Sequence, residues 1–170
     1  ALLRALSSEH PLDRSSQQST ELLTLNVVRP HIKLFPVRTP TLPPATHTNV
    51  YLLGDRRLTI VDPASPYPKE QARLERWLDE YREGGGVIER VLLTHHHADH
   101  IGGVQALCDR YQLPVWAHEE TAKRVPFKVD RLLEDGEEIE VSSTRFVALF
   151  TPGHAPGHLC FFHPPTGTAI

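Results

Sequence analysis

Residues 87–103, VIERVLLTHHHADHIGG, decide the fold that we expect for this chain. Residues 87–93 have the apolar character of a buried strand, and the periodicity after Gly103 predicts a helix over 103–111. Between them, four histidines and Asp99 form the pattern His-x-His-x-Asp-His. A strand that runs into metal-ligating side chains and then into a helix predicts a metal site in a mixed α/β protein.

The spacing within this loop suits two neighbouring ions. His95 and His97 are two residues apart, and in extended backbone this spacing points both side chains the same way, toward one ion. Asp99 and His100 follow a bend and are placed to reach a second ion nearby. Imidazole together with carboxylate suits Zn²⁺ best, with iron or manganese as less favoured alternatives. A surface cluster of histidines is the simpler alternative, but it leaves the offset of Asp99 unexplained.

Two other polar loops also follow predicted strands. The strand predicted over 58–61 ends at Asp62, and the turn Thr151-Pro152-Gly153-His154 follows the strand predicted over 145–150. Because active-site loops of such sheets lie at the carboxyl ends of strands, we expect Asp62, His154 and the histidine loop to meet. His158 is interpreted either as a support for the ligands or as the start of a strand.

Hydrophobic periodicity and turn residues predict the remaining elements. Strands are expected over 22–28, 32–37, 50–53, 58–61, 87–93, 115–117, 145–150 and 158–162, helices over 67–82 and 103–111, a helical turn over 119–125, and a hairpin over 132–141 that turns at Asp135-Gly136. This order favours a mixed sheet with helices packed outside. The proline-rich segment 39–48 is expected to be a stiff loop at the rim of the site.

The composition is that of an ordinary soluble globular domain. The chain has 170 residues, 39% of them hydrophobic, and a net charge of −3. No apolar run reaches the roughly 18 residues that a membrane span needs, and the charge gives no general attraction to nucleic acid or anionic membranes. The two cysteines, Cys108 and Cys160, exclude a disulfide-rich scaffold and are interpreted as packing residues.

The chain contains no methionine, and we therefore expect it to be a piece of a longer protein. Residues 1–21 are polar and rich in Ser and Gln, as in a linker or the tail of an upstream domain. Residues 22–170 are expected to form the N-terminal part of the metal-binding domain, with residues 168–170 opening a further strand. A cytoplasmic location is expected, and the oligomeric state is left open.

The two histidine motifs resemble those of the metallo-β-lactamase-fold hydrolase superfamily. The resemblance rests on Thr94-His-His-His-Ala-Asp-His-Ile-Gly-Gly103 and on Thr151-Pro-Gly-His154. The segments Asn49-Val-Tyr-Leu-Leu53 and Ile60-Val-Asp-Pro63 add to it, since they resemble the first two strand motifs of the superfamily. The resemblance covers residues 22–170 and implies an αββα four-layer α/β sandwich. It also implies that the fold is incomplete at the C-terminus, because the family's bridging aspartate and final histidine would follow Ile170.

The same resemblance implies a role for each motif residue. His95, His97 and His154 would hold the first metal ion, and Asp99 and His100 would contribute to the second. Asp62 would brace the loop through hydrogen bonds without binding metal. The complete domain would hold two Zn²⁺ ions, with iron or manganese possible, and Asp99 would orient metal-bound hydroxide or carry its proton.

The segment 151–162, TPGHAPGHLCFF, resembles the glyoxalase II and lactamase-beta-2-like branches. These imply that the complete parent protein is an enzyme, a metal-dependent hydrolase of an ester, thioester, lactone or related bond. Three alternatives stay open: a lactamase-beta-2-like endoribonuclease, an iron-dependent oxidoreductase resembling persulfide dioxygenase, and a truncated domain that only binds metal. A small-molecule substrate is favoured over RNA, for which only a modest basic group is available: Lys123, Arg124, Lys128 and Arg131.

Overall fold

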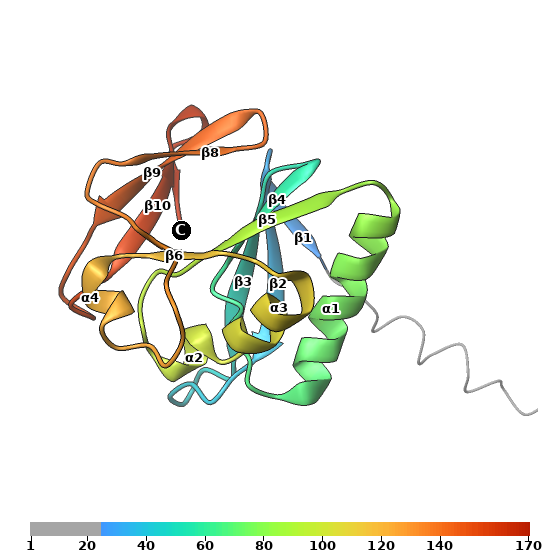
Figure 1. Ribbon diagram of the computed structural model, residues 1–170, viewed down its shortest axis with the longest axis horizontal. Helices are drawn as coiled ribbons and strands as arrows, with labels where there is room; N and C mark the ends of the chain where they lie inside the picture. Colours follow the sequence, from blue (N-terminus) through green and yellow to red (C-terminus); the bar gives the residue numbers. More distant parts are fainter. Residues whose placement is uncertain (1–24) are drawn as a thin grey trace, which may run out of the picture.

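Two β-sheets lie face to face, with helices along the larger one, in the computed structural model of residues 25–170 (Figure 1). The linker predicted over 1–21 and the first residues of the strand predicted over 22–28 lie outside the described residues. Every helix within residues 25–170 is too short or too polar to span a bilayer.

The larger sheet has seven strands that lie side by side in chain order. They are β1 (Asn26–Arg29), β2 (Ile32–Arg38), β3 (His47–Leu53), β4 (Arg57–Val61), β5 (Val87–Leu92), β6 (Val115–Ala117) and β7 (Arg131–Leu132). The first four pair antiparallel, with short turns except for the proline-rich loop between β2 and β3, whereas β4 to β7 pair in parallel.

Parallel neighbours need crossover connections, and helices supply them. The helix α1 (Pro68–Glu83) joins β4 to β5, α2 (Ala98–Ile101) and α3 (Val104–Tyr111) join β5 to β6, and α4 (Glu119–Ala122) joins β6 to β7. These connections place the polar loops after β4 and β5 at one edge of the sheet, as the sequence predicts.

The smaller sheet is antiparallel, with the strand order β11-β10-β9-β8. It consists of β8 (Glu138–Val141), β9 (Thr144–Phe150), β10 (Leu159–His163) and, after the 3-10 turn η1 (Pro164–Thr166), β11 (Thr168–Ala169). The strand expected from residue 168 onward is therefore present, and it pairs with β10.

Alternation along the central strands builds two separate cores. Leu52 and Ile60 pack with the buried faces of α1 and α3, while their neighbours Leu53 and Val61 pack against the smaller sheet. Successive side chains of a strand point to opposite faces, so a continuous apolar run fills both sides of the larger sheet. Helices, larger sheet and smaller sheet thus form successive layers, which confirms the expected mixed α/β architecture. Of the four layers that the resemblance implies, these are the first three.

The hairpin predicted over 132–141 is wrong. Its first half, β7, pairs with β6 in the larger sheet, whereas its second half, β8, pairs with β9 in the smaller one. The Asp135-Gly136 turn is real, with Gly136 at φ +77°, but turn chemistry does not determine which strands pair. Several boundaries also move: β3 begins at His47 within the proline-rich segment, α2 lies inside the predicted histidine loop, and the helical turn expected over 119–125 ends at Ala122.

Candidate metal centre

Backbone hydrogen bonds bring the three polar loops to one place. The Asp62 N–H donates to the Leu92 carbonyl (3.0 Å), which sets the end of β4 beside the end of β5. The Leu159 N–H donates to the Thr94 carbonyl (2.9 Å), which ties the start of β10 to the same loop. Loops from both sheets therefore meet at the carboxyl ends of β4, β5 and β9.

Asp62 is buried at the centre of this meeting point, with 3% of its surface exposed. Its carboxylate accepts hydrogen bonds from the Thr94 N–H (2.8 Å), the Thr94 hydroxyl and the His100 Nδ1 atom (2.8 Å). Its backbone has a left-handed conformation, with φ +49°, which Asp tolerates better than most residues. These hydrogen bonds hold the histidine loop to the end of β4, and the bracing role of Asp62 remains a prediction.

Two adjacent glycines allow the histidine loop to lie directly on the chain that follows Asp62. A Cβ atom on Gly102 would lie 2.7 Å from the Ala64 carbonyl oxygen, and one on Gly103 would lie 2.6 Å from that of Pro63. The Gly103 N–H donates to the same Pro63 oxygen (2.7 Å). Any larger side chain would push the loop away from Asp62.

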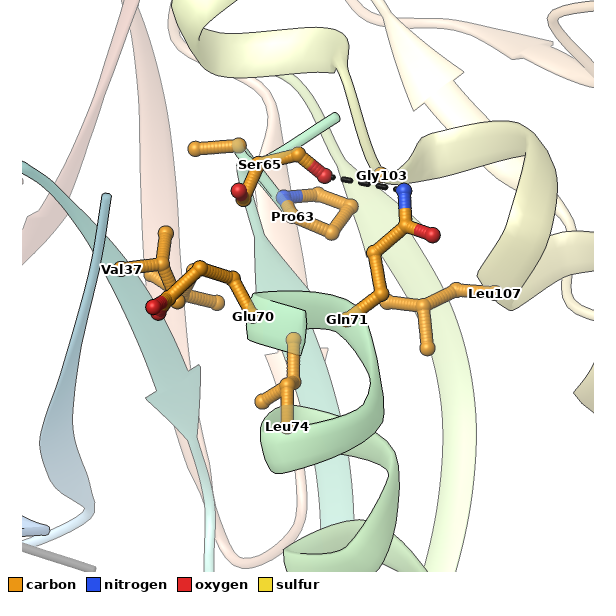
Figure 2. Close-up of a pocket in the computed structure, with 10 residues that line it drawn as sticks. Val37, Pro63, Ser65, Glu70, Gln71, Leu74, Gly103 and Leu107 are labelled. Atoms are coloured by element: carbon orange, nitrogen blue, oxygen red, sulfur yellow. Dashed lines mark hydrogen bonds between the residues drawn. The ribbon is translucent and has the colours of Figure 1, made fainter. Parts of the chain in front are cut away.

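The segment that follows Asp62 is also contacted by α1, because the Gln71 side-chain amide donates to the Ser65 carbonyl (3.0 Å; Figure 2). The cavity beside it measures only about 10 Å³, room for about one water molecule. It is a packing gap behind the site, too small to bind a substrate.

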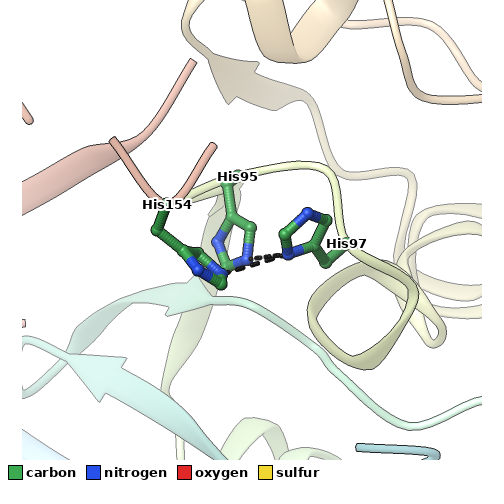
Figure 3. Close-up of side chains that lie close together, drawn as sticks. All are labelled: His95, His97 and His154. Carbon is green, nitrogen blue, oxygen red and sulfur yellow. Dashed lines mark hydrogen bonds between the residues drawn. The ribbon is translucent and has the colours of Figure 1, made fainter. Parts of the chain in front are cut away.

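The imidazoles of His95, His97 and His154 converge, although His154 comes from the other sheet (Figure 3). His97 Nδ1 lies 3.1 Å from His95 Nε2 and 3.1 Å from His154 Nε2. Tetrahedral coordination with metal–nitrogen bonds of about 2.0–2.1 Å places ligand nitrogens about 3.3 Å apart. Both measured distances are thus within a few tenths of an ångström of the value for one Zn²⁺ ion, and all three nitrogens lie within 4.8 Å of one another.

A hydrogen-bond relay fixes the proton of His95. The Thr94 hydroxyl donates its proton to Asp62, so the hydroxyl oxygen must accept a hydrogen bond from His95 Nδ1 (2.9 Å). The proton of the His95 ring is therefore on Nδ1, and its lone pair is on Nε2, which faces His97 and His154. Burial, followed by the charges of the surrounding histidines, lowers the pKa of His95 to about 2. The ring is thus neutral at physiological pH and binds a metal without first losing a proton.

The second predicted site is only partly assembled in the described residues. Asp99, His100 and His158 line one cleft of about 380 Å³. The only close ligand group there that contains His100 consists of Asp62, His95 and His100, and both Asp62 oxygens are already occupied by hydrogen bonds. The contribution of Asp99 and His100 to a second ion remains a prediction.

Two opposing effects act on His100. Burial alone lowers its pKa, but the hydrogen bond and the charge of Asp62, helped by Asp99, raise the pKa above the ordinary value. Donation from Nδ1 to Asp62 leaves Nε2 as the atom available to a metal.

His158 lies just before β10 and faces the site. Its Nδ1 atom is 2.8 Å from the Thr151 hydroxyl, and its ring centroid is 5.2 Å from that of His95. Burial and the nearby His154 lower its pKa. The position fits a support for the ligand rings, which remains a prediction, and the strand begins one residue later, at Leu159.

Sequence reasoning did not single out Thr94, which links Asp62 to His95, although its place directly after the apolar run 87–93 was a usable signal. His47 lies in the proline-rich segment 39–48 and lines the cleft together with Thr41 and Thr48. The proline-rich segment therefore does form a rim of the site. Cys108 is partly buried against the helix-side core, and burial raises the pKa of its thiol to about 11, which fits a packing residue.

Two packed sheets with three imidazoles converging at their common edge define a metal-binding α/β protein. A sequence model described as "Metallo-beta-lactamase superfamily" matches residues 43–170. The chain belongs to that superfamily.

Individual relatives add detail. The chain is 36% identical over 126 residues to a hydroxyacylglutathione hydrolase of Enterobacter sp. (strain 638), a match that covers 72% of this chain and 46% of the relative. A beta-lactamase domain protein from Burkholderia ambifaria has the same fold, with a TM-score of 0.72, 23% identity and coverage of 86% of this chain and 54% of that one. The protein TTHA1623, solved in a di-iron-bound form, gives a TM-score of 0.57 at 29% identity, with 79% and 69% covered. The chain spans about half the length of the curated relatives that it matches.

Proposed function

We propose that the protein containing this chain is a metal-dependent hydrolase that cleaves a thioester of a small thiol. The observation that carries the proposal is the convergence of His95, His97 and His154 on one point. The thioester is favoured among carbonyl substrates because the curated relatives are hydroxyacylglutathione hydrolases. Zn²⁺ fits the three nitrogens, and the di-iron form of one structural relative keeps iron as the alternative.

Each residue of the site has a separate role in the proposed reaction. His95, His97 and His154 would hold the ion, which when bound supplies the Lewis acidity that activates water and polarises a carbonyl group. Asp62 accepts directly from His100 and reaches His95 through the Thr94 hydroxyl. It thereby keeps both imidazoles in the tautomer that leaves Nε2 unprotonated. Asp99 lines the cleft beside His100 and would accept and return a proton at its carboxylate.

The electrostatics of the surface favour a small substrate over RNA. All four members of the basic group are neutralised by carboxylates: Lys123 by Glu119 and Glu120, Arg124 by Glu120, Lys128 by Asp130, and Arg131 by Glu137. An RNA backbone would have to compete with each of these ion pairs. The cleft of about 380 Å³ has the size of a small-molecule site.

The test is a substrate panel on the natural full-length protein loaded with Zn²⁺ or Fe²⁺. We expect hydrolysis of a hydroxyacyl thioester of glutathione to exceed that of a matched oxygen ester, a lactone and single-stranded RNA. A His97→Ala variant should lose both bound metal and turnover. RNA cleavage, oxygen uptake with a persulfide, or metal binding without turnover of any substrate would each overturn the proposal.

A further inference from the structure

The loop that carries His154 needs an external support. Residues 151–157 form no helix or strand, and His154 itself is exposed. Its partners His95 and His97 belong to a loop of the other sheet, so the two loops must be held in register for the three nitrogens to share an ion. A displacement of about 1 Å is enough to spoil such a site.

The loop closes its own base with backbone hydrogen bonds. The Thr151 N–H donates to the His158 carbonyl (2.9 Å), and the His158 N–H donates to the Ala155 carbonyl (3.2 Å). These bonds fix the shape of the loop, and the Leu159 N–H bond to the Thr94 carbonyl (2.9 Å) ties its C-terminal side to the histidine loop of the larger sheet.

A side chain from α4 holds the loop at a second point, two residues earlier. The Thr121 hydroxyl donates to the Gly157 carbonyl (3.0 Å). Apart from the contact of His154 with His97, it is the one side-chain hydrogen bond that joins another element to loop residues 152–157 within the described chain. Thr121 is completely buried, with 0% of its surface exposed, so water cannot take the place of its hydroxyl.

The fit between α4 and the loop is also tight in shape. A Cβ atom on Gly157 would lie 2.4 Å from the Thr121 backbone nitrogen and 2.5 Å from its hydroxyl oxygen. The helix follows β6 after a single residue, His118, whose Nδ1 atom caps the helix by accepting the Glu120 N–H (3.1 Å). The larger sheet thus reaches the His154 loop through α4 (Figure 1).

We propose that Thr121 is a positioning residue for the metal site, whose hydroxyl holds the Gly157 end of the loop so that His154 stays in reach of His95 and His97. The inference rests on the proposed metal site and adds a residue that none of the histidine motifs contains. Without the hydroxyl, the buried Gly157 carbonyl loses its partner, and the loop moves to find another.

The test compares Thr121→Val, which keeps the shape and removes the hydroxyl, with Thr121→Ser, which keeps the hydroxyl. Thr59→Val is the matched control, because Thr59 is equally buried and its hydroxyl has no hydrogen-bond partner. Zn²⁺ affinity is measured by competition with a chelator, and the unfolding free energy of the metal-free protein is measured alongside. If Thr121→Val does not fold, Thr121→Ala takes its place.

Thr121→Val should weaken Zn²⁺ binding about five- to tenfold, as expected for one buried hydrogen bond, whereas Thr121→Ser should stay within about twofold of the wild type. Thr59→Val should leave the affinity unchanged. Equal affinity in Thr121→Val and the wild type, or a loss that serine does not restore, would overturn the inference. Failure of the wild type itself to bind Zn²⁺ through its histidines would instead overturn the proposed function.

Discussion

Replacing Asp62 by Asn should uncouple the brace from the ligands while keeping the size of the side chain. The carboxylate accepts from the Thr94 N–H, the Thr94 hydroxyl and His100 Nδ1. Asn retains the first bond and presents an N–H₂ donor where the other two groups also donate. The Thr94 hydroxyl can turn to accept, but His100 can accept only by moving its proton from Nδ1 to Nε2.

The expected loss of unfolding free energy follows from the two hydrogen bonds that change. Two hydrogen bonds to a buried carboxylate, at about 1.5–3 kcal/mol each, are replaced by two neutral ones of about 1 kcal/mol, so the metal-free protein should lose about 1–4 kcal/mol of unfolding free energy. The pKa of His100 should fall below its ordinary value, because burial then acts without the opposing charge of Asp62. The protonated Nε2 should lower the affinity for metal at His100 by about 10–100-fold.

Three measurements on Asp62→Asn check this reasoning: urea unfolding of the metal-free protein, NMR titration of His100, and metal affinity. Asp79→Asn is a suitable control, since Asp79 is a carboxylate that hydrogen-bonds Tyr111 and Arg110 far along α1. The reasoning is refuted if Asp62→Asn keeps the raised pKa of His100 and unfolds within about 0.5 kcal/mol of the wild type.

Three further changes have defined outcomes. Gly103→Ala should destabilise the protein by about 1–3 kcal/mol, because the new methyl group would overlap the Pro63 carbonyl; an unchanged unfolding midpoint in urea would contradict the close contact. Burial and the neighbouring His31 lower the pKa of His163. As the pH decreases below about 6.5, this histidine is protonated in the unfolded chain before it is protonated in the folded one. The free energy of unfolding therefore decreases by up to about 1.4 kcal/mol for each unit by which the pH is lowered. In the metal-free protein, His163→Gln should therefore show a smaller loss between pH 7.5 and 5.5 than the wild type, and an equal loss would argue against this role. Asp99→Ala in the full-length protein should reduce turnover far more than it reduces metal content at the three-histidine site, and unchanged hydrolysis would exclude Asp99 from the reaction.

The parts of the fold that follow from local pattern were predictable. The periodicity of residues 67–82 predicted α1, and the apolar run at 87–93 predicted β5, because both signals depend only on neighbouring residues. The pairing of residues 131–141 was not predictable, since β7 and β8 find their partners in different sheets and the turn between them is the same either way.

In the site too, some features were predictable from the sequence and others were not. The meeting of Asp62, His95 and His154 followed from the rule that active-site loops gather at the carboxyl ends of strands. The role of Thr94 depends on the relative position of two side chains, and that of Thr121 depends on how α4 packs against a loop 36 residues further along the chain. No sequence spacing encodes such contacts, and only the packed structure reveals them.

The most direct test of the metal centre is anomalous diffraction at the zinc absorption edge, from crystals of the Zn²⁺-loaded protein. The account predicts a peak about 2.0–2.1 Å from one ring nitrogen each of His95, His97 and His154. Zinc bound elsewhere, or a peak that leaves out His154, would contradict the claim that loops of the two sheets share one ion.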